Sequence, residues 1–108
     1  MIRLLTTVVR RITVVGSSME PTFLDGDRLT IVRRWRRVRV GDVVVVPDPR
    51  EPTRPLLKRC AARDGRRLDL RGDNPLASTD SRDFGPVEER RVRWLVVPSS
   101  GGHDQGRR

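Results

Sequence analysis

The order of apolar and polar positions along this chain predicts a domain built mainly from β-strands. Residues 43–46 form an unbroken valine run, which is typical of a strand buried on both faces. The other apolar segments are short, rich in β-branched residues and separated by turn-forming residues. Six segments have the length and composition of strands: residues 12–15, 28–32, 43–46, 56–61, 66–70 and 92–97.

Turn-forming residues divide these segments. Asp64-Gly65 separates two of them and is a dipeptide favoured in tight hairpins, because both central residues accept positive φ. Clusters of Gly, Asp, Asn and Pro mark further turns at residues 25–27, 41–42, 47–49 and 72–75. No helix of three turns or more is predicted after residue 15. We therefore expect an all-β fold, a small twisted antiparallel sheet or partly closed barrel of linked hairpins.

The two ends of the chain differ from this pattern. Residues 1–11 carry apolar positions at helical spacing and three arginines, which fits a short amphipathic helix on a membrane, although a plain first helix or strand is favoured. They contain no run of about 20 apolar residues, so no convincing membrane span is predicted. Residues 99–108 have the composition of a disordered tail. The expected organisation is an N-terminal segment 1–11, a domain 12–98 and a tail 99–108.

Composition limits the chemistry. The net charge of +9 attracts nucleic acid, anionic lipid or acidic proteins, but arginine richness without lysine also resembles a coding bias, so charge says little about partners. A single cysteine, Cys60, excludes an internal disulfide and a multi-cysteine zinc site. The one histidine, His103, lies in the tail, which argues against a Ser-His-Asp triad. We expect no metal and no cofactor.

The most informative residue is the lone lysine. Of the 23 basic residues only Lys58 is not arginine, and lysine differs from arginine in that its side chain can become neutral when desolvated. Ser18 follows a predicted strand at a glycine turn, and a serine needs a base to become a nucleophile. Without a positioned histidine, Lys58 is the candidate base, because burial beside Leu56 and Leu57 would lower its pKa. The alternatives are a turn-capping serine and a lysine retained by chance.

Four motifs carry a family resemblance. They are Gly-Ser-Ser-Met-Glu-Pro-Thr at 16–22, Gly-Asp-Val-Val-Val-Val at 41–46, Lys-Arg at 58–59, and Gly-Asp-Asn-Pro-Leu-Ala-Ser-Thr-Asp-Ser-Arg-Asp-Phe-Gly-Pro-Val at 72–87. Together, and in this order, they resemble the catalytic-domain boxes of type I signal peptidases. The resemblance implies that Ser18 is the nucleophile, that Lys58 is its general base, and that the hydroxyl of Ser78 orients the lysine amine.

The resemblance also implies supporting roles. Asp80 and Arg82 match an ion pair that holds the loop of Ser78, and Met19 matches a hydrophobic residue near the substrate pocket. Gly16 stands where some members carry a serine of the oxyanion hole, so here the hole would use backbone N–H groups, chiefly that of Ser18. The expected oxyanion and substrate pocket comprises Gly16, Ser17, Met19 and Pro21, and the expected structural support comprises Asp80, Arg82, Gly72, Asp73 and Asn74.

The short chain, with no clear anchor and no large second domain, resembles the maturation proteases associated with nickel-type superoxide dismutase. This implies removal of an N-terminal leader from a precursor bound as an extended peptide, in the cytoplasm or at a membrane surface. General signal peptidase-like processing of exported proteins is the alternative. A self-cleaving protein similar to SOS repressors and a catalytically inactive binding module rank lower.

An arginine-rich segment is the main rival feature. Five arginines surround one tryptophan between residues 33 and 39. The simplest interpretation is a solvated loop between strands. Peripheral contact with an anionic membrane comes next, with the indole at the interface, and nucleic-acid binding is last. The residues proposed for membrane contact are Arg33, Arg34, Trp35, Arg36 and Arg37.

Overall fold

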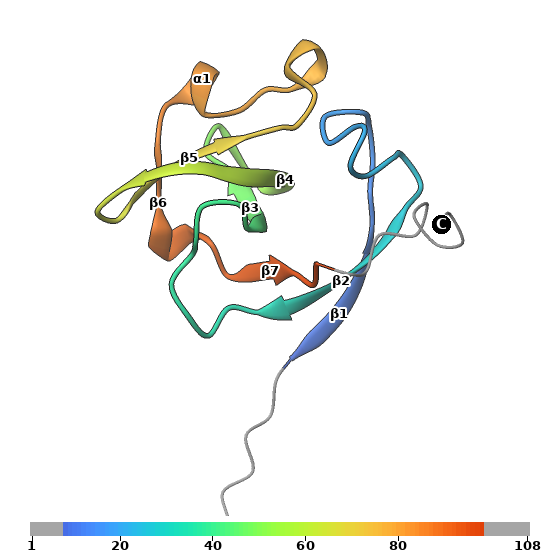
Figure 1. Cartoon of the computed structure of the whole chain (residues 1–108), viewed down its shortest axis with the longest axis horizontal. Coiled ribbons are helices and arrows are strands. Elements are labelled where there is room, and N and C mark those ends of the chain that lie inside the picture. Colours follow the sequence, from blue (N-terminus) through green and yellow to red (C-terminus); the bar gives the residue numbers. More distant parts are fainter. Residues whose placement is uncertain (1–7, 99–108) are drawn as a thin grey trace, which may run out of the picture.

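The computed structural model describes residues 8–98, which form one seven-stranded antiparallel sheet that is twisted but not closed into a barrel (Figure 1). The strand order is β1-β2-β7-β3-β4-β5-β6, so the last strand lies inside the sheet, between β2 and β3. This confirms the predicted all-β class. The strands are β1 (Val9–Thr13), β2 (Arg28–Arg33), β3 (Val43–Asp48), β4 (Glu51–Asp64), β5 (Arg67–Arg71), β6 (Val87–Glu88) and β7 (Trp94–Val96).

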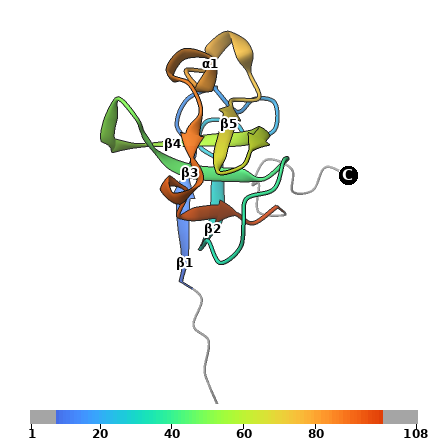
Figure 2. The ribbon, with the colours of Figure 1, turned by 90° about the vertical axis from the view of Figure 1, so that its left-hand side faces the viewer.

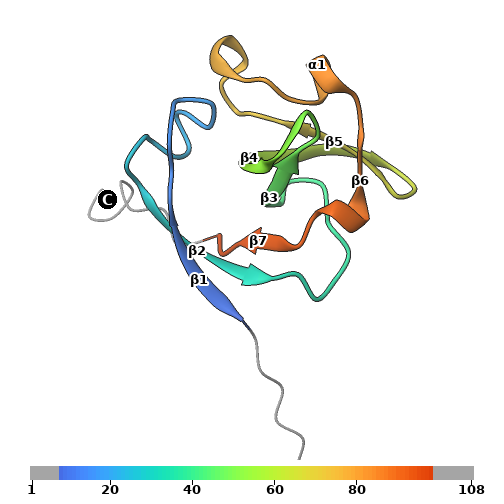
Figure 3. The same ribbon diagram turned by 180° about the vertical axis from the view of Figure 1, so that it is seen from behind.

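Three short helical turns lie between β5 and β7, a stretch in which the sequence predicts a turn and then no regular structure. They are η1 (Pro75–Ala77), α1 (Ser81–Phe84) and η2 (Glu89–Arg91). Asp80 caps α1: its side chain accepts from the backbone N–H of Arg82, and the Asp83 side chain accepts from the backbone N–H of Asp80. Seen from behind, this stretch connects the two halves of the sheet (Figure 3).

Several strand limits differ from the prediction. β1 covers residues 9–13 rather than 12–15, because all five of its residues pair with β2. Residues 9–11 are therefore strand and not helix, while residues 1–7 and the predicted tail at 99–108 lie outside the described residues. β4 is also longer than predicted and forms a hairpin with β3 that projects from the body of the domain (Figure 2).

The core consists of two apolar clusters, one on each side of the valine strand. Val44 and Val46 pack in one cluster and Val43 in the other, so β3 is buried on both faces as its sequence predicts. The second cluster includes Met19 and Phe23 from the β1–β2 loop. Burial of these two side chains fixes that loop against the sheet, and the loop carries Ser18.

The helical turns between residues 8 and 98 are all too short to span a bilayer.

Candidate functional site

Ser18 lies in the loop that joins β1 to β2. Met19 is only 1% exposed and anchors the loop in the core, whereas Ser18 beside it is half-buried at the surface. Gly16 enters the loop with φ +87°, a conformation that favours glycine, and its N–H donates to Oδ1 of Asp25 at 2.7 Å. The loop is thus tied at its entrance and at Met19, which leaves the Ser18 hydroxyl at a fixed place on the surface.

Lys58 reaches this region from β4, opposite Val44 on β3. Lys58 is 3% exposed, and its Nζ donates to Oγ of Ser78 at 2.9 Å. The Ser78 hydroxyl in turn donates to Oδ2 of Asp80 at 2.9 Å. Since the single hydroxyl proton of Ser78 is given to Asp80, Ser78 acts only as an acceptor toward Lys58. The lone pair of a neutral Lys58 amine is therefore left for another partner.

Asp80 is the fixed end of this chain of hydrogen bonds. The residue is 0% exposed, and its carboxylate accepts from the backbone N–H groups of Gly72 and Arg82 at 3.0 Å each. The Arg82 guanidinium donates to both carboxylate oxygens, at 3.0 and 2.7 Å. Burial opposes ionisation, but these donors together hold the pKa of Asp80 well below its usual range. Asp80 therefore stays an acceptor at neutral pH.

The surroundings of Lys58 favour its neutral form. Desolvation is the largest influence and lowers the pKa of Lys58 below its ordinary value of 10.5. The positive charges of Arg82 and Arg54 act in the same direction, and the negative charge of Asp80 opposes them. The balance is a depressed pKa, which is what a lysine general base requires.

The loop that carries Ser78 is packed directly against the loop that carries Ser18. The backbone N–H of Asn74 donates to the Ser18 carbonyl at 2.9 Å, and its side-chain amide donates to the Ser17 carbonyl at 3.1 Å. Gly72 permits this approach, because a Cβ atom there would lie 2.2 Å from Oγ of Ser78 and 2.7 Å from the Ser18 carbonyl oxygen. The two loops therefore set the relative position of the serines.

A second connection joins the same loops through Asp73. Its carboxylate accepts two hydrogen bonds from Arg59, at 2.9 and 2.8 Å, and one from the Thr22 hydroxyl at 2.6 Å. Arg59 follows Lys58 on β4, and Thr22 ends the Ser18 motif. The sequence predicts no role for Arg59 or Thr22, and their places within the motifs are the only signal for them.

Ser18 and Lys58 line one cleft of about 430 Å³. Their side chains do not hydrogen-bond to each other within the described chain, and catalytic hydrogen bonds often tighten only when substrate binds. Four residues predicted for the pocket, Gly16, Ser17, Met19 and Pro21, are not in the lining. The lining residues are Ile12, Thr13, Val14, Val15, Ser18, Val45, Arg54, Pro55, Leu56, Leu57, Lys58, Ala77 and Thr79.

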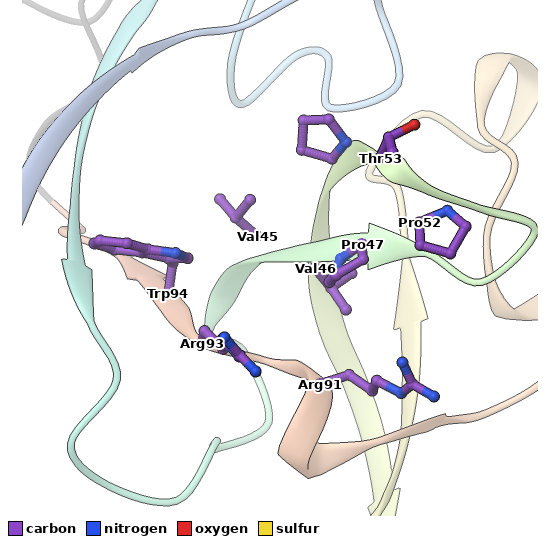
Figure 4. A pocket seen from close by; sticks show the side chains of 9 residues that line it. Val45, Val46, Pro47, Pro52, Thr53, Arg91, Arg93 and Trp94 are labelled. Atoms are coloured by element: carbon purple, nitrogen blue, oxygen red, sulfur yellow. The ribbon is translucent and has the colours of Figure 1, made fainter.

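A smaller hollow of about 270 Å³ lies beside the cleft. Figure 4 shows the side chains that line this hollow. Val45 and Pro55 line both, and the hollow continues between the β3–β4 hairpin and Trp94. It contains none of the predicted catalytic residues.

The arginine-rich segment makes more internal contacts than the sequence suggests. Arg34 donates to the carbonyls of Val92 and Arg36 at 2.6 Å each, and Arg36 makes two hydrogen bonds with Asp42. The guanidinium of Arg37 lies 3.4 Å from the buried carboxylate of Glu89. Trp35, in contrast, is 68% exposed. Several arginines of the segment therefore bond to other parts of the domain, and membrane contact through the segment stays a prediction.

Because Lys58 is the only lysine, its ionisation can be followed without ambiguity. In protein labelled with ¹³C-lysine, we expect a single Cε signal that titrates below pH 10.5 in the folded chain and near 10.5 after denaturation. Between those two values the unfolded chain holds a proton that the folded chain has lost, so stability should rise with pH across that window. A folded-state midpoint at or above 10.5 would contradict the desolvated site.

A known protein family matches most of the chain. The sequence profile of the family described as Signal peptidase, peptidase S26 matches residues 1–74, which include Ser18, Lys58 and the Gly72–Asn74 turn, but not Ser78, Asp80 or Arg82. The chain is 37% identical over 98 residues to the mitochondrial ATP-independent inner membrane protease subunit 1a of Arabidopsis thaliana, with 67% of this chain and 58% of that protein covered.

Similar proteins occur in animals. The chain is 30% identical over 104 residues to mitochondrial inner membrane protease subunit 1 of Xenopus tropicalis, with 75% of this chain and 62% of that protein covered. It is 28% identical to the human subunit 1 over the same length, with 75% and 63% covered. The chain thus spans about three fifths of the length of these curated relatives. With a family match over more than half of its residues, the chain belongs to the signal peptidase family, peptidase S26.

Proposed function

We propose that the chain is a serine endopeptidase in which Ser18 and Lys58 form a catalytic dyad. The observation that carries the proposal is the desolvated Lys58 amine, which shares a cleft with Ser18 and donates to a Ser78 hydroxyl whose proton is held by Asp80. This arrangement favours the neutral form of the amine, whose free lone pair is what the hydroxyl of Ser18 in the same cleft needs as a base. Burial of Lys58 also speaks against an inactive binding module with an exposed lysine.

In the proposed reaction the Lys58 amine removes the proton from the Ser18 hydroxyl as Oγ attacks the scissile carbonyl carbon. The resulting ammonium protonates the leaving amine when the C–N bond breaks, which leaves an ester on Ser18. Lys58 then takes a proton from water, the hydroxide attacks the ester, and Ser18 recovers its proton as the acid product leaves. No external oxidant, metal or cofactor takes part in these steps.

The oxyanion of the tetrahedral intermediate needs backbone donors. The N–H of Gly16 is bonded to Asp25 and is therefore occupied. The N–H of Ser18 makes no hydrogen bond within residues 8–98, so we assign it as the principal donor, with Ser17 beside it.

The proposed substrate is a precursor protein that loses an N-terminal leader or signal peptide. It would bind as an extended strand, with small side chains near the cleavage point. A nickel superoxide dismutase precursor is one proposed substrate, which the motif at residues 72–87 suggests. The inner membrane proteases among the relatives favour processing at a membrane surface, with peripheral attachment of this chain. We assign the activity to residues 12–98, together with the start of β1.

Ser18→Ala is the direct test. Incubation of the purified chain with leader-bearing precursors, among them a nickel superoxide dismutase precursor, should release a new N-terminus that mass spectrometry identifies. The variant should lose this cleavage by at least about a thousandfold, because alanine lacks the hydroxyl proposed as the nucleophile. Thr53→Ala removes an exposed hydroxyl outside the cleft and should cleave normally. Equal cleavage by Ser18→Ala and wild type would refute Ser18 as the nucleophile.

A further inference from the structure

Arg54 faces the cleft from the β3–β4 hairpin. It is exposed, and it lines the cleft together with Lys58, four residues further along β4. The β3–β4 ladder is irregular here: Pro47 pairs with Pro55 and Asp48 with Glu51, so residues 52–54 have no partners on β3. Such bulges redirect side chains and are common beside active sites. The irregularity thus brings a guanidinium to the cleft wall.

The charge of Arg54 is not neutralised by the protein. Arg54 makes no hydrogen bond and no ion pair within residues 8–98, whereas Arg59, Arg63 and Arg82 each hold a carboxylate with two or more hydrogen bonds. Asp48 is within electrostatic reach, but it is buried and already accepts from the Arg50 N–H at 2.8 Å, with the Arg50 guanidinium at 3.6 Å.

The remainder of the cleft lining offers no negative charge either. Its residues are apolar, hydroxyl-bearing or basic, and none is Asp or Glu. A guanidinium in a largely apolar cleft recognises a carboxylate well, because it donates two parallel hydrogen bonds in a fixed geometry. A basic side chain of a substrate would be repelled at the same place.

We propose that Arg54 forms an anion-binding subsite that takes an aspartate or glutamate side chain of the precursor, about four residues from the scissile bond. The position follows from strand geometry: four residues along β4 span about 13 Å, and an extended peptide beside the strand advances at the same rate. The inference rests on the proposed peptidase function and adds a selectivity for acidic residues to it.

Pairs of quenched fluorescent peptides that differ only in glutamate or glutamine at one position test the subsite. The ratio of kcat/KM values for each pair is measured with the same enzyme, so any effect of Arg54 on the pKa of Lys58 cancels. For wild type we expect a preference for glutamate of roughly threefold to tenfold at a position about four residues from the cleaved bond. Arg54→Gln should reduce the ratio to about one, and Arg54→Glu should make lysine the preferred residue.

Arg67→Gln is the matched control, because it removes the same charge from an exposed position on β5 outside the cleft. It should retain the wild-type ratio, and Arg54→Lys should retain part of it. Equal ratios in wild type and Arg54→Gln would overturn the subsite while leaving the peptidase proposal intact. If wild type cleaves no peptide, the subsite is tested by binding instead. Fluorescence anisotropy then measures the affinity of Ser18→Ala for the glutamate peptide and for the glutamine peptide. Equal affinities reject the subsite.

Discussion

Lys58→Arg is expected to abolish peptide cleavage, with a loss in kcat of at least about a thousandfold. The substitution keeps a long basic side chain, but a guanidinium does not give up its proton in a protein and so has no lone pair for the Ser18 hydroxyl. The chain already uses arginine at every other basic position, so the lysine at this one position is an informative exception. The measurement is steady-state cleavage of a leader-derived peptide.

Lys58 is only 3% exposed, so a charged guanidinium at this position also risks destabilising the fold. Lys58→Met addresses this, because methionine fills a similar volume without charge and should fold well while remaining inactive. Thermal unfolding of both variants separates a loss of chemistry from a loss of structure. Cleavage at near the wild-type rate by a folded Lys58→Arg or Lys58→Met protein would show that Lys58 is not the base.

The local sequence predicted the fold class and the central strand better than the limits of the outer strands. The valine run at 43–46 predicts a strand that is buried on both faces, and β3 is buried on both faces. The limits of β1 depend on its partner, since Val9 pairs with Val32 across the sheet. β6 is two residues long and exists only by pairing with β5, so it leaves no periodic signal. Such elements are set by tertiary contacts rather than by local propensity.

The residues of the candidate site also differ in how far the local sequence predicted them. The residues alone indicate Ser18 and Lys58, because the predicted domain 12–98 contains no histidine and a single lysine. Ser78 and Asp80 entered only through the family resemblance, because the hydrogen bond from Lys58 to Ser78 joins residues 20 positions apart on different elements. The contact of Asn74 with Ser18 depends on how two loops meet above the sheet, which no local pattern encodes. The catalytic roles of these residues stay predictions.

Gly72→Ala is expected to lower both stability and activity, although it adds a single methyl group. The new Cβ would lie 2.2 Å from Oγ and 2.6 Å from Cβ of Ser78, and 2.7 Å from the Ser18 carbonyl oxygen. That oxygen is backbone and accepts from Asn74, so it cannot move without shifting the Ser18 loop. Relief of the overlap therefore separates the two loops. We expect a loss of about 1–3 kcal/mol in the free energy of unfolding.

The expected loss in kcat/KM is larger than this destabilisation alone would produce. A displacement of about 1 Å between reacting groups can cost about a hundredfold in rate, and here both Ser18 and the serine that binds Lys58 are displaced. Gly65→Ala is the matched control, because Gly65 has φ +59° and no neighbour within 4 Å of an added Cβ. It should lose about 1 kcal/mol through backbone strain and keep its rate per folded molecule. Wild-type stability and kcat/KM in Gly72→Ala would refute the close packing that places Ser78 beside Ser18.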